Sequence, residues 1–183
     1  MTKIISWVVV IALIIGGVWW WQSHKSAPVE VTPTPTPTET GPSTKTYTDP
    51  TNGVSYVYPT SLPTKYITAI DWPPKVQVLG KKLSCTVAGS ATSTAGATMK
   101  RTINGTPYCV TTETEGAAGS IYNNYAYAME NGGKTYIFTF STRSVQCANY
   151  DDPQKTECEQ ERASFNIDNV IDSIVRSAFP SAS

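Results

Sequence analysis

The sequence predicts an α+β fold: an antiparallel β-sheet with a C-terminal amphipathic helix packed on one face, preceded by a transmembrane helix and a disordered linker. Three observations predict it. An apolar run of about one membrane thickness begins the chain, short alternating segments flank Asn-Gly turns, and residues 167–178 adopt a helical period. We therefore divide the chain into an anchor (1–21), a linker (22–46) and a domain (47–183).

The anchor is the apolar run of residues 4–21, which as a helix spans roughly 27 Å of a hydrocarbon core of ~30 Å. Trp19, Trp20 and Trp21 end the run, and indole rings suit the membrane–water interface. A cleaved signal peptide is the alternative, but its apolar region is normally about 7–15 residues long and ends at a small-residue cleavage site. We expect an uncleaved single-pass anchor in the lipid bilayer.

The linker, residues 22–46, alternates Thr and Pro through its centre. Such a sequence cannot form helical or sheet hydrogen bonds and has no apolar face to bury. At ~3.1 Å per residue in an extended polyproline II conformation, it would reach about 75 Å. We expect a stalk that holds the domain away from the bilayer, with a composition that also suits O-linked sugars.

The domain begins with short alternating segments that predict strands. The expected strands are residues 54–58, 66–71, 76–79, 99–103, 107–113, 121–129 and 134–145. Asn104-Gly105 and the Gly132-Gly133 pair each lie between two of these strands and predict hairpins. Residues 116–119 are expected to form a further hairpin connection, and residues 82–97 a loop.

Helical periodicity appears only near the end of the chain. Apolar residues recur at helical spacing over residues 167–178, with Asn166 or Asp168 available to cap the start and Arg176 near the end, where a cation suits the helix dipole. A second short helix is expected over residues 155–164. The long helix should pack on one face of the sheet.

The domain contains four cysteines, Cys85, Cys109, Cys147 and Cys158. Their even number after an anchor and a stalk predicts two disulfides. We favour Cys147–Cys158, which would close a turn-rich loop, and this leaves Cys85–Cys109. Zinc binding is disfavoured because the domain has neither a C-x-x-C pair nor a histidine. Disulfides persist in oxidising compartments, so the domain should be extracytoplasmic.

Two segments carry a resemblance to a known family. Residues 47–59, with Asn52-Gly53 leading into a strand and a Tyr-Pro, resemble the start of PsbP-like domains. The long strand, the loop bounded by Cys147 and Cys158, and the final helix resemble a set of single-anchor bacterial envelope proteins. The resemblance implies an antiparallel sheet flanked by helices, and a role in binding or assembly rather than catalysis.

The composition excludes several functions. The chain carries 14 basic and 14 acidic side chains, and this balance argues against a nucleic-acid binder. Its one histidine, His24, lies in the linker, so the domain cannot form a Ser-His-Asp or Cys-His arrangement. Phosphate-binding and metal-binding motifs are also missing from the sequence. We expect no cofactor, no metal and no enzymatic activity; an enzyme that uses lysines and carboxylates remains an alternative.

Charge is segregated along the domain. Residues 65–101 hold six basic residues and one acid, whereas residues 151–172 hold seven acids and two basic residues. Ordinary solvated faces would explain this, but a dipolar surface would suit a charged envelope protein or a second copy. The candidate binding-surface residues are Lys81, Lys82, Tyr125, Tyr127 and Trp72. For Trp72 we favour a place in the core beneath a loop over exposure as a binding anchor.

We therefore favour a membrane-anchored, extracytoplasmic, non-enzymatic binding or assembly module of the cell envelope, with another envelope protein as its partner. The alternative is a small-ligand or lipid sensor or carrier. Its pocket would lie between sheet and helix and be lined by Tyr125, Tyr127, Tyr136 and Phe138.

Overall fold

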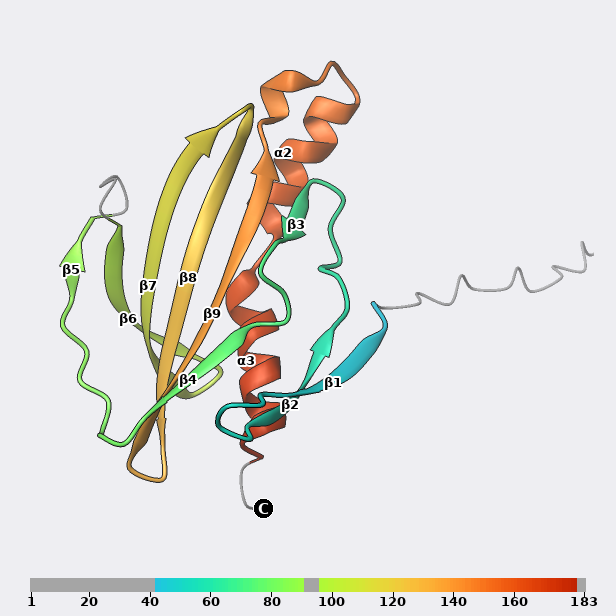
Figure 1. Cartoon of the computed structure of the whole chain (residues 1–183). Helices are drawn as coiled ribbons and strands as arrows, with labels where there is room; N and C mark the ends of the chain where they lie inside the picture. Colours follow the sequence, from blue (N-terminus) through green and yellow to red (C-terminus); the bar gives the residue numbers. More distant parts are fainter. Residues whose placement is uncertain (1–41, 91–95, 181–183) are drawn as a thin grey trace, which may run out of the picture. The chain divides into compact units, whose positions relative to one another are not determined.

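The computed structural model describes residues 42–90 and 96–180. Its elements, labelled as in Figure 1, are β1 (Thr44–Thr48), β2 (Ser55–Pro59), β3 (Ile67–Ala69), β4 (Lys75–Leu79), β5 (Ala88–Gly89), β6 (Ala97–Ile103), β7 (Thr106–Ala117), β8 (Ser120–Asn131), β9 (Lys134–Val145), the 3₁₀ turn η1 (Cys147–Asn149), α2 (Gln154–Ser164) and α3 (Ile167–Ala178). The predicted α+β class, with an antiparallel sheet and C-terminal helices packed on it, is confirmed.

Four consecutive strands, β6 to β9, form the centre of a seven-stranded antiparallel sheet. Tight turns join them at the predicted positions. Asn104 and Gly105 both have positive φ, 47° and 87°, which a two-residue hairpin turn with the twist of the strands requires. The connection between β7 and β8 repeats this geometry at Ala118 and Gly119.

The sheet is completed at both edges by short strands. β3 and β4 both pair with β9, and β5 pairs with β6 through only two residues. The segment between β4 and β5, residues 80–87, therefore runs from one edge of the sheet to the other. The sequence predicted a loop here, but not that it crosses the sheet.

The first two strands form a separate two-stranded ribbon. β1 begins at Thr44, three residues before the predicted domain boundary at residue 47. The composition did not show this boundary, because the start of β1 is as rich in Thr as the linker. β2 contacts α3, where the backbone N–H of Val57 donates to Ser177 Oγ at 2.8 Å. The strand predicted at residues 54–58 therefore belongs to this ribbon rather than to the main sheet.

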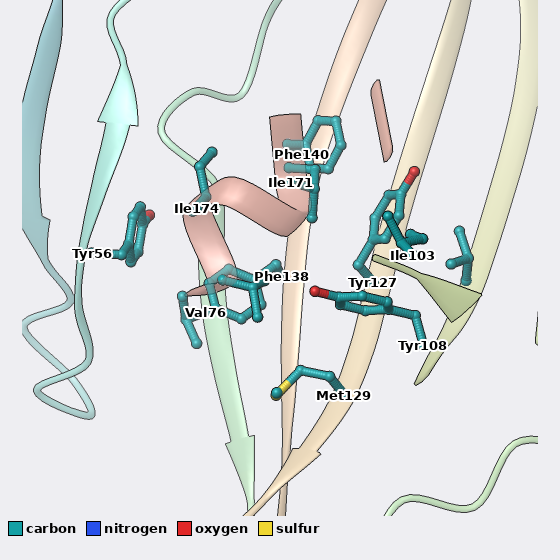
Figure 2. Packing of buried hydrophobic residues seen from close by; sticks show 12 residues of the cluster. Tyr56, Val76, Ile103, Tyr108, Tyr127, Met129, Phe138, Phe140, Ile171 and Ile174 are labelled. Carbon is teal, nitrogen blue, oxygen red and sulfur yellow. The ribbon is translucent and has the colours of Figure 1, made fainter. Parts of the chain in front are cut away.

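The core lies between the ribbon, α3 and one face of the main sheet (Figure 2). The predicted stripe of α3 supplies Ile171, Ile174 and Val175, all buried. Phe138 and Phe140 face them from β9. Asn166 caps α3 as predicted, accepting a hydrogen bond from the Asp168 N–H at 3.0 Å.

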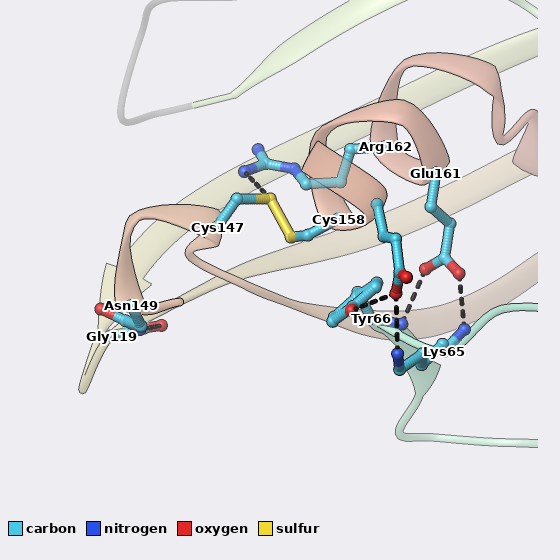
Figure 3. The surroundings of a disulfide bond; sticks show 9 residues. Lys65, Tyr66, Gly119, Cys147, Asn149, Cys158, Glu161 and Arg162 are labelled. Atoms are coloured by element: carbon cyan, nitrogen blue, oxygen red, sulfur yellow. Dashed lines mark hydrogen bonds and ion pairs between the residues drawn. A yellow bond between two sulfur atoms is a disulfide. The ribbon is translucent and has the colours of Figure 1, made fainter. Parts of the chain in front are cut away.

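The shorter helix, α2, is fixed to the end of the sheet by a disulfide and two glutamates (Figure 3). Glu161 accepts hydrogen bonds from the backbone N–H groups of Lys65 and Tyr66 at 2.6 and 2.7 Å. Glu157 accepts from Lys65 Nζ at 2.9 Å and from the Tyr66 hydroxyl at 3.1 Å. These contacts hold the segment before β3 against α2, and the Lys65 ammonium lowers the pKa of Glu157.

Both predicted disulfides, Cys85–Cys109 and Cys147–Cys158, are present. They indicate an oxidising, extracytoplasmic environment for the domain. The anchor, with Trp19, Trp20 and Trp21, and nearly all of the linker lie outside the described residues. Within 42–90 and 96–180, neither α2 nor α3 has the length and apolar character needed to cross a bilayer.

Candidate functional site

The main sheet has one face covered by α3 and one face, here called the open face, that no described helix covers (Figure 1). Strand register identifies a row of directly paired residues that crosses it. The row consists of Lys75, Thr139, Ala126, Thr111, Thr98 and Ala88. Its four central members are Thr or Ala, so the middle of the open face carries only small side chains, and the long side chain of Lys75 lies at one end of the row.

Residues 80–87 cross this face as a strap. The Cys85–Cys109 disulfide attaches the strap to β7. Glu130 Oε2 accepts a hydrogen bond from the backbone N–H of Leu83 at 3.0 Å, and Thr135 Oγ1 donates to the carbonyl oxygen of Lys81 at 2.8 Å. Two hydrogen bonds and one covalent link thus fix a segment that has no regular secondary structure.

Hollows lie on both sides of the strap. One, of about 230 Å³, has an apolar floor formed by Leu79, Leu83 and Ile137, with Lys81 and Lys82 at its border. A second, of about 310 Å³, lies toward β6. Its lining residues are Leu83, Cys85, Lys100, Arg101, Thr102, Pro107 and Tyr108.

A third hollow, of about 290 Å³, lies further along the open face. Thr111 and Ala126 line both this hollow and the one of about 230 Å³, so the two lie next to each other on the open face. Asp71, Lys75 and Glu113 supply its charged groups. The open face therefore carries an extended depression with both charged and apolar parts.

Four lysines at this depression are exposed: Lys75, Lys81, Lys82 and Lys100. In the described part of the chain none of them forms an ion pair, since the pairs found there are Lys65–Glu157, Arg101–Asp168 and Arg176–Asp172. The basic stretch predicted from the sequence is thus divided. Its first and last members are paired with acids of the helices, Lys81 and Lys82 belong to the strap, and Lys75 and Lys100 lie on β4 and β6 at the hollows of the open face.

The predicted binding residues do not all belong to this site. Lys81 and Lys82 border the hollow beside the strap, and Tyr125 lines the third hollow. Trp72 lies elsewhere: its indole N–H donates to the carbonyl oxygen of Pro59 at 2.6 Å, and its ring packs edge-on against Phe140. Of the two roles weighed for Trp72, packing beneath a loop is the one observed.

At Tyr127, Tyr136 and Phe138, three of the four residues expected to line an aromatic pocket, the space between sheet and helix is filled. Tyr127 and Phe138 are 0% exposed and pack in the core with α3 (Figure 2). Tyr136 packs against Phe179, with 4.5 Å between ring centroids, and Tyr125 stacks on Phe140 at 5.1 Å. The expectations that Tyr127 and Phe138 line a pocket and that Tyr127 lies on the surface were therefore wrong. The alternation of residues in a strand shows which side chains share a face of the sheet, but not whether another segment covers that face.

Sequence reasoning missed a buried polar cluster beneath α3. Asp172, 1% exposed, accepts hydrogen bonds from the Tyr108 hydroxyl at 2.9 Å, Asn104 Nδ2 at 2.9 Å and Arg176 Nε at 2.8 Å. Burial, together with the hydrogen bond to Asp172, raises the pKa of Tyr108. The carboxylate is satisfied by internal donors, so this cluster stabilises the helix–sheet contact.

One turn earlier on α3, Asp168 binds Arg101 at 2.8 and 3.0 Å and accepts a hydrogen bond from the Tyr127 hydroxyl. Burial, with this hydrogen bond, raises the pKa of Tyr127. Tyr108 and Tyr127 both lie on the side of their strands that faces α3. Nothing in the sequence, however, indicates that their hydroxyls donate to Asp172 and Asp168, two acids four residues apart on α3.

Among residues 42–90 and 96–180, no three side chains of the types that bind metals come together. Comparison of the chain with protein-family models, curated proteins and solved structures finds no match. The candidate site is therefore defined by its own geometry: an open sheet face, a disulfide-held strap, apolar hollows and four lysines that form no ion pair with any described residue.

Proposed function

We propose that the chain is a single-pass membrane protein whose extracytoplasmic domain is a non-enzymatic binding or assembly module of the cell envelope. The apolar run of residues 4–21 and the Thr/Pro-rich linker support the anchor and the stalk. The PsbP-like resemblance supports a role in binding. The observation that carries the proposal is the open face, which is hollowed, crossed by the strap and bordered by lysines.

The partner is an acidic, partly apolar segment of another envelope protein. Lys81, Lys82 and Lys100 are exposed ammonium groups without acidic partners among the described residues, so carboxylates of a partner would complement them. Leu79 and Ile137 offer apolar surface between these charges. Such an arrangement, an apolar centre with a charged border, is typical of protein interfaces.

Photo-crosslinking in intact cells tests this proposal with the full chain. A photoreactive residue replaces Lys82, which is exposed at the border of the hollow, and a second sample carries it at Glu159, exposed on α2. We expect a discrete adduct from position 82, but none of the same mass from position 159. Mass spectrometry of the adduct should identify an acidic segment.

Charge reversal provides the matched control. Lys81→Glu with Lys100→Glu should remove the adduct, because repulsion replaces attraction at the site. Lys45→Glu with Lys155→Glu changes the net charge equally at exposed lysines that form no ion pair with described residues, and should leave the adduct intact. Absence of an adduct at position 82, or equal loss in both double variants, would refute the proposed interface.

A further inference from the structure

A polar hollow of about 200 Å³ lies on the other side of the sheet from the strap, where the sheet meets the junction of α2 and α3. Its polar lining comes from Asn123, Tyr125, Thr142, Ser144 and Arg162. Ile67, Phe165 and Ile167 provide apolar walls. The hollow lies beyond the part of the core that α3 fills.

The sequence of β9 changes character at this hollow. Phe138 and Phe140 face the core, and the next two residues on the same face are Thr142 and Ser144. Both remain buried, 2% and 6% exposed, although their side chains are polar. Thr142 shares a side-chain hydrogen bond with Tyr125, which compensates its burial. Burying a hydroxyl without a partner is unfavourable, so Ser144 is the polar position that requires a reason.

Two donors at the hollow lack strong partners. The Ser144 hydroxyl forms no hydrogen bond with another described residue. Arg162 forms no ion pair in 42–90 and 96–180; its contact is from Nη1 to Cys147 Sγ at 4.0 Å, across the disulfide (Figure 3). A guanidinium and a hydroxyl therefore remain available to an acceptor.

The nearby carboxylates do not compete for this arginine. Glu161, on the same helix, accepts the backbone N–H groups of Lys65 and Tyr66. Asp168, one residue after Ile167, is bound by Arg101 at 2.8 Å. Neither carboxylate pairs with Arg162, and Glu159, three residues earlier on α2, forms no ion pair with it either.

We infer that this hollow binds a small carboxylate with a short apolar part. The guanidinium fork matches the two oxygens of a carboxylate, and the Ser144 hydroxyl can donate to one of them. Phe165 and Ile167 cover the apolar part. The volume is below the ~300–1,000 Å³ usual for larger ligands, which restricts the site to a small molecule. The inference does not depend on the proposed envelope interface, because Arg162 and Ser144, which carry it, do not line the three hollows described on the open face.

Thermal unfolding of the full chain in detergent, followed by near-ultraviolet circular dichroism, tests this inference with acetate and butyrate as probes at constant ionic strength. We expect a saturable rise of the unfolding temperature, about 4 °C at ten times the Kd, and tighter binding of butyrate than of acetate. Arg162→Gln should remove the rise. Lys155→Gln, an exposed change on the same helix, should retain it.

Ser144→Ala keeps the test decisive if Arg162→Gln lowers the stability of the domain. Loss of one hydrogen bond to a charged acceptor should weaken butyrate binding by about tenfold or more. The inference is overturned if neither carboxylate produces a saturable rise, if the rise survives Arg162→Gln, or if inorganic phosphate binds more tightly than butyrate, which would assign a different class of anion. None of these results would affect crosslinking from position 82.

Discussion

Replacing Asp172 with alanine should lower the free energy of unfolding by about 3 kcal/mol. Asp172 is 1% exposed and accepts hydrogen bonds from Tyr108, Asn104 and Arg176. Removing one member of a buried charged pair typically costs about 3–5 kcal/mol. We take the lower end because the Arg176 side chain is 51% exposed and regains water, whereas the Tyr108 hydroxyl, in a residue 2% exposed, is left without its partner.

Urea unfolding of the full chain in detergent, followed by near-ultraviolet circular dichroism, measures the effect. With a urea dependence of about 2 kcal/mol per molar, the midpoint should fall by about 1.5 M. Glu159→Ala, an exposed change on α2, should shift the stability by less than about 0.5 kcal/mol. Combining Asp172→Ala with Tyr108→Phe should cost less than the sum of the two, because the second change removes the hydroxyl that the first leaves unpaired.

A loss below about 1 kcal/mol for Asp172→Ala would refute this reasoning, since it would mean that water replaces the lost acceptor. Strict additivity of Asp172→Ala and Tyr108→Phe would refute it separately, because residues in direct hydrogen-bonded contact should show a coupling energy of about 1 kcal/mol.

Two further predictions concern pH and the disulfides. Burial, with the hydrogen bonds to Asp172 and Asp168, raises the pKa of Tyr108 and Tyr127, so the folded state keeps protons that the unfolded state releases near pH 10.0. The free energy of unfolding should therefore be fully retained below pH 10.0 and fall above it. Urea unfolding at a series of pH values from about 8 to about 11 measures this, and a flat profile would contradict it. Replacing both Cys85 and Cys109 with serine should lower the free energy of unfolding by about 3 kcal/mol, the value of the chain-entropy model for a separation of 24 residues. Peptide mapping of the unaltered chain without reductant should find both disulfides and no free thiol among these four cysteines.

Local sequence signals predicted most of the secondary structure. Asn104-Gly105 specifies a hairpin because few other dipeptides adopt positive φ twice, and the apolar stripe of α3 has no other periodic interpretation. The pairing of the four cysteines also followed from local reasoning, because a short turn-rich loop separates Cys147 from Cys158.

Features that depend on distant contacts were not predictable in this way. Asp172 occupies a polar position of the α3 pattern, yet Tyr108 and Asn104 from a distant hairpin enclose it. Thr142 and Ser144 resemble solvent-facing strand residues, yet they are buried. In each case the residue's own neighbours in sequence determine the direction of its side chain, whereas segments far along the chain determine whether water reaches it.

The candidate site shows the same division. Lys81 and Lys82 were identified from the basic stretch, but Lys100 joins them only because β6 lies beside β7, where the strap is attached. The strap itself required knowledge that β4 pairs with β9 while β5 pairs with β6. That topology makes a segment without periodic pattern the cover of a sheet face.

The crossing of the sheet by residues 80–87 has a consequence for the order in which the domain folds. Strands β6 to β9 are neighbours in sequence and can pair through short turns, and the Cys147–Cys158 link closes over only 11 residues. The Cys85–Cys109 link closes over 24 residues, through β5, β6 and the first part of β7, and needs neither β4 nor β9. We therefore expect Cys147–Cys158 to close at the lower entropic cost, whereas Cys85–Cys109 fixes the strap to β7 as soon as the β6–β7 hairpin has formed.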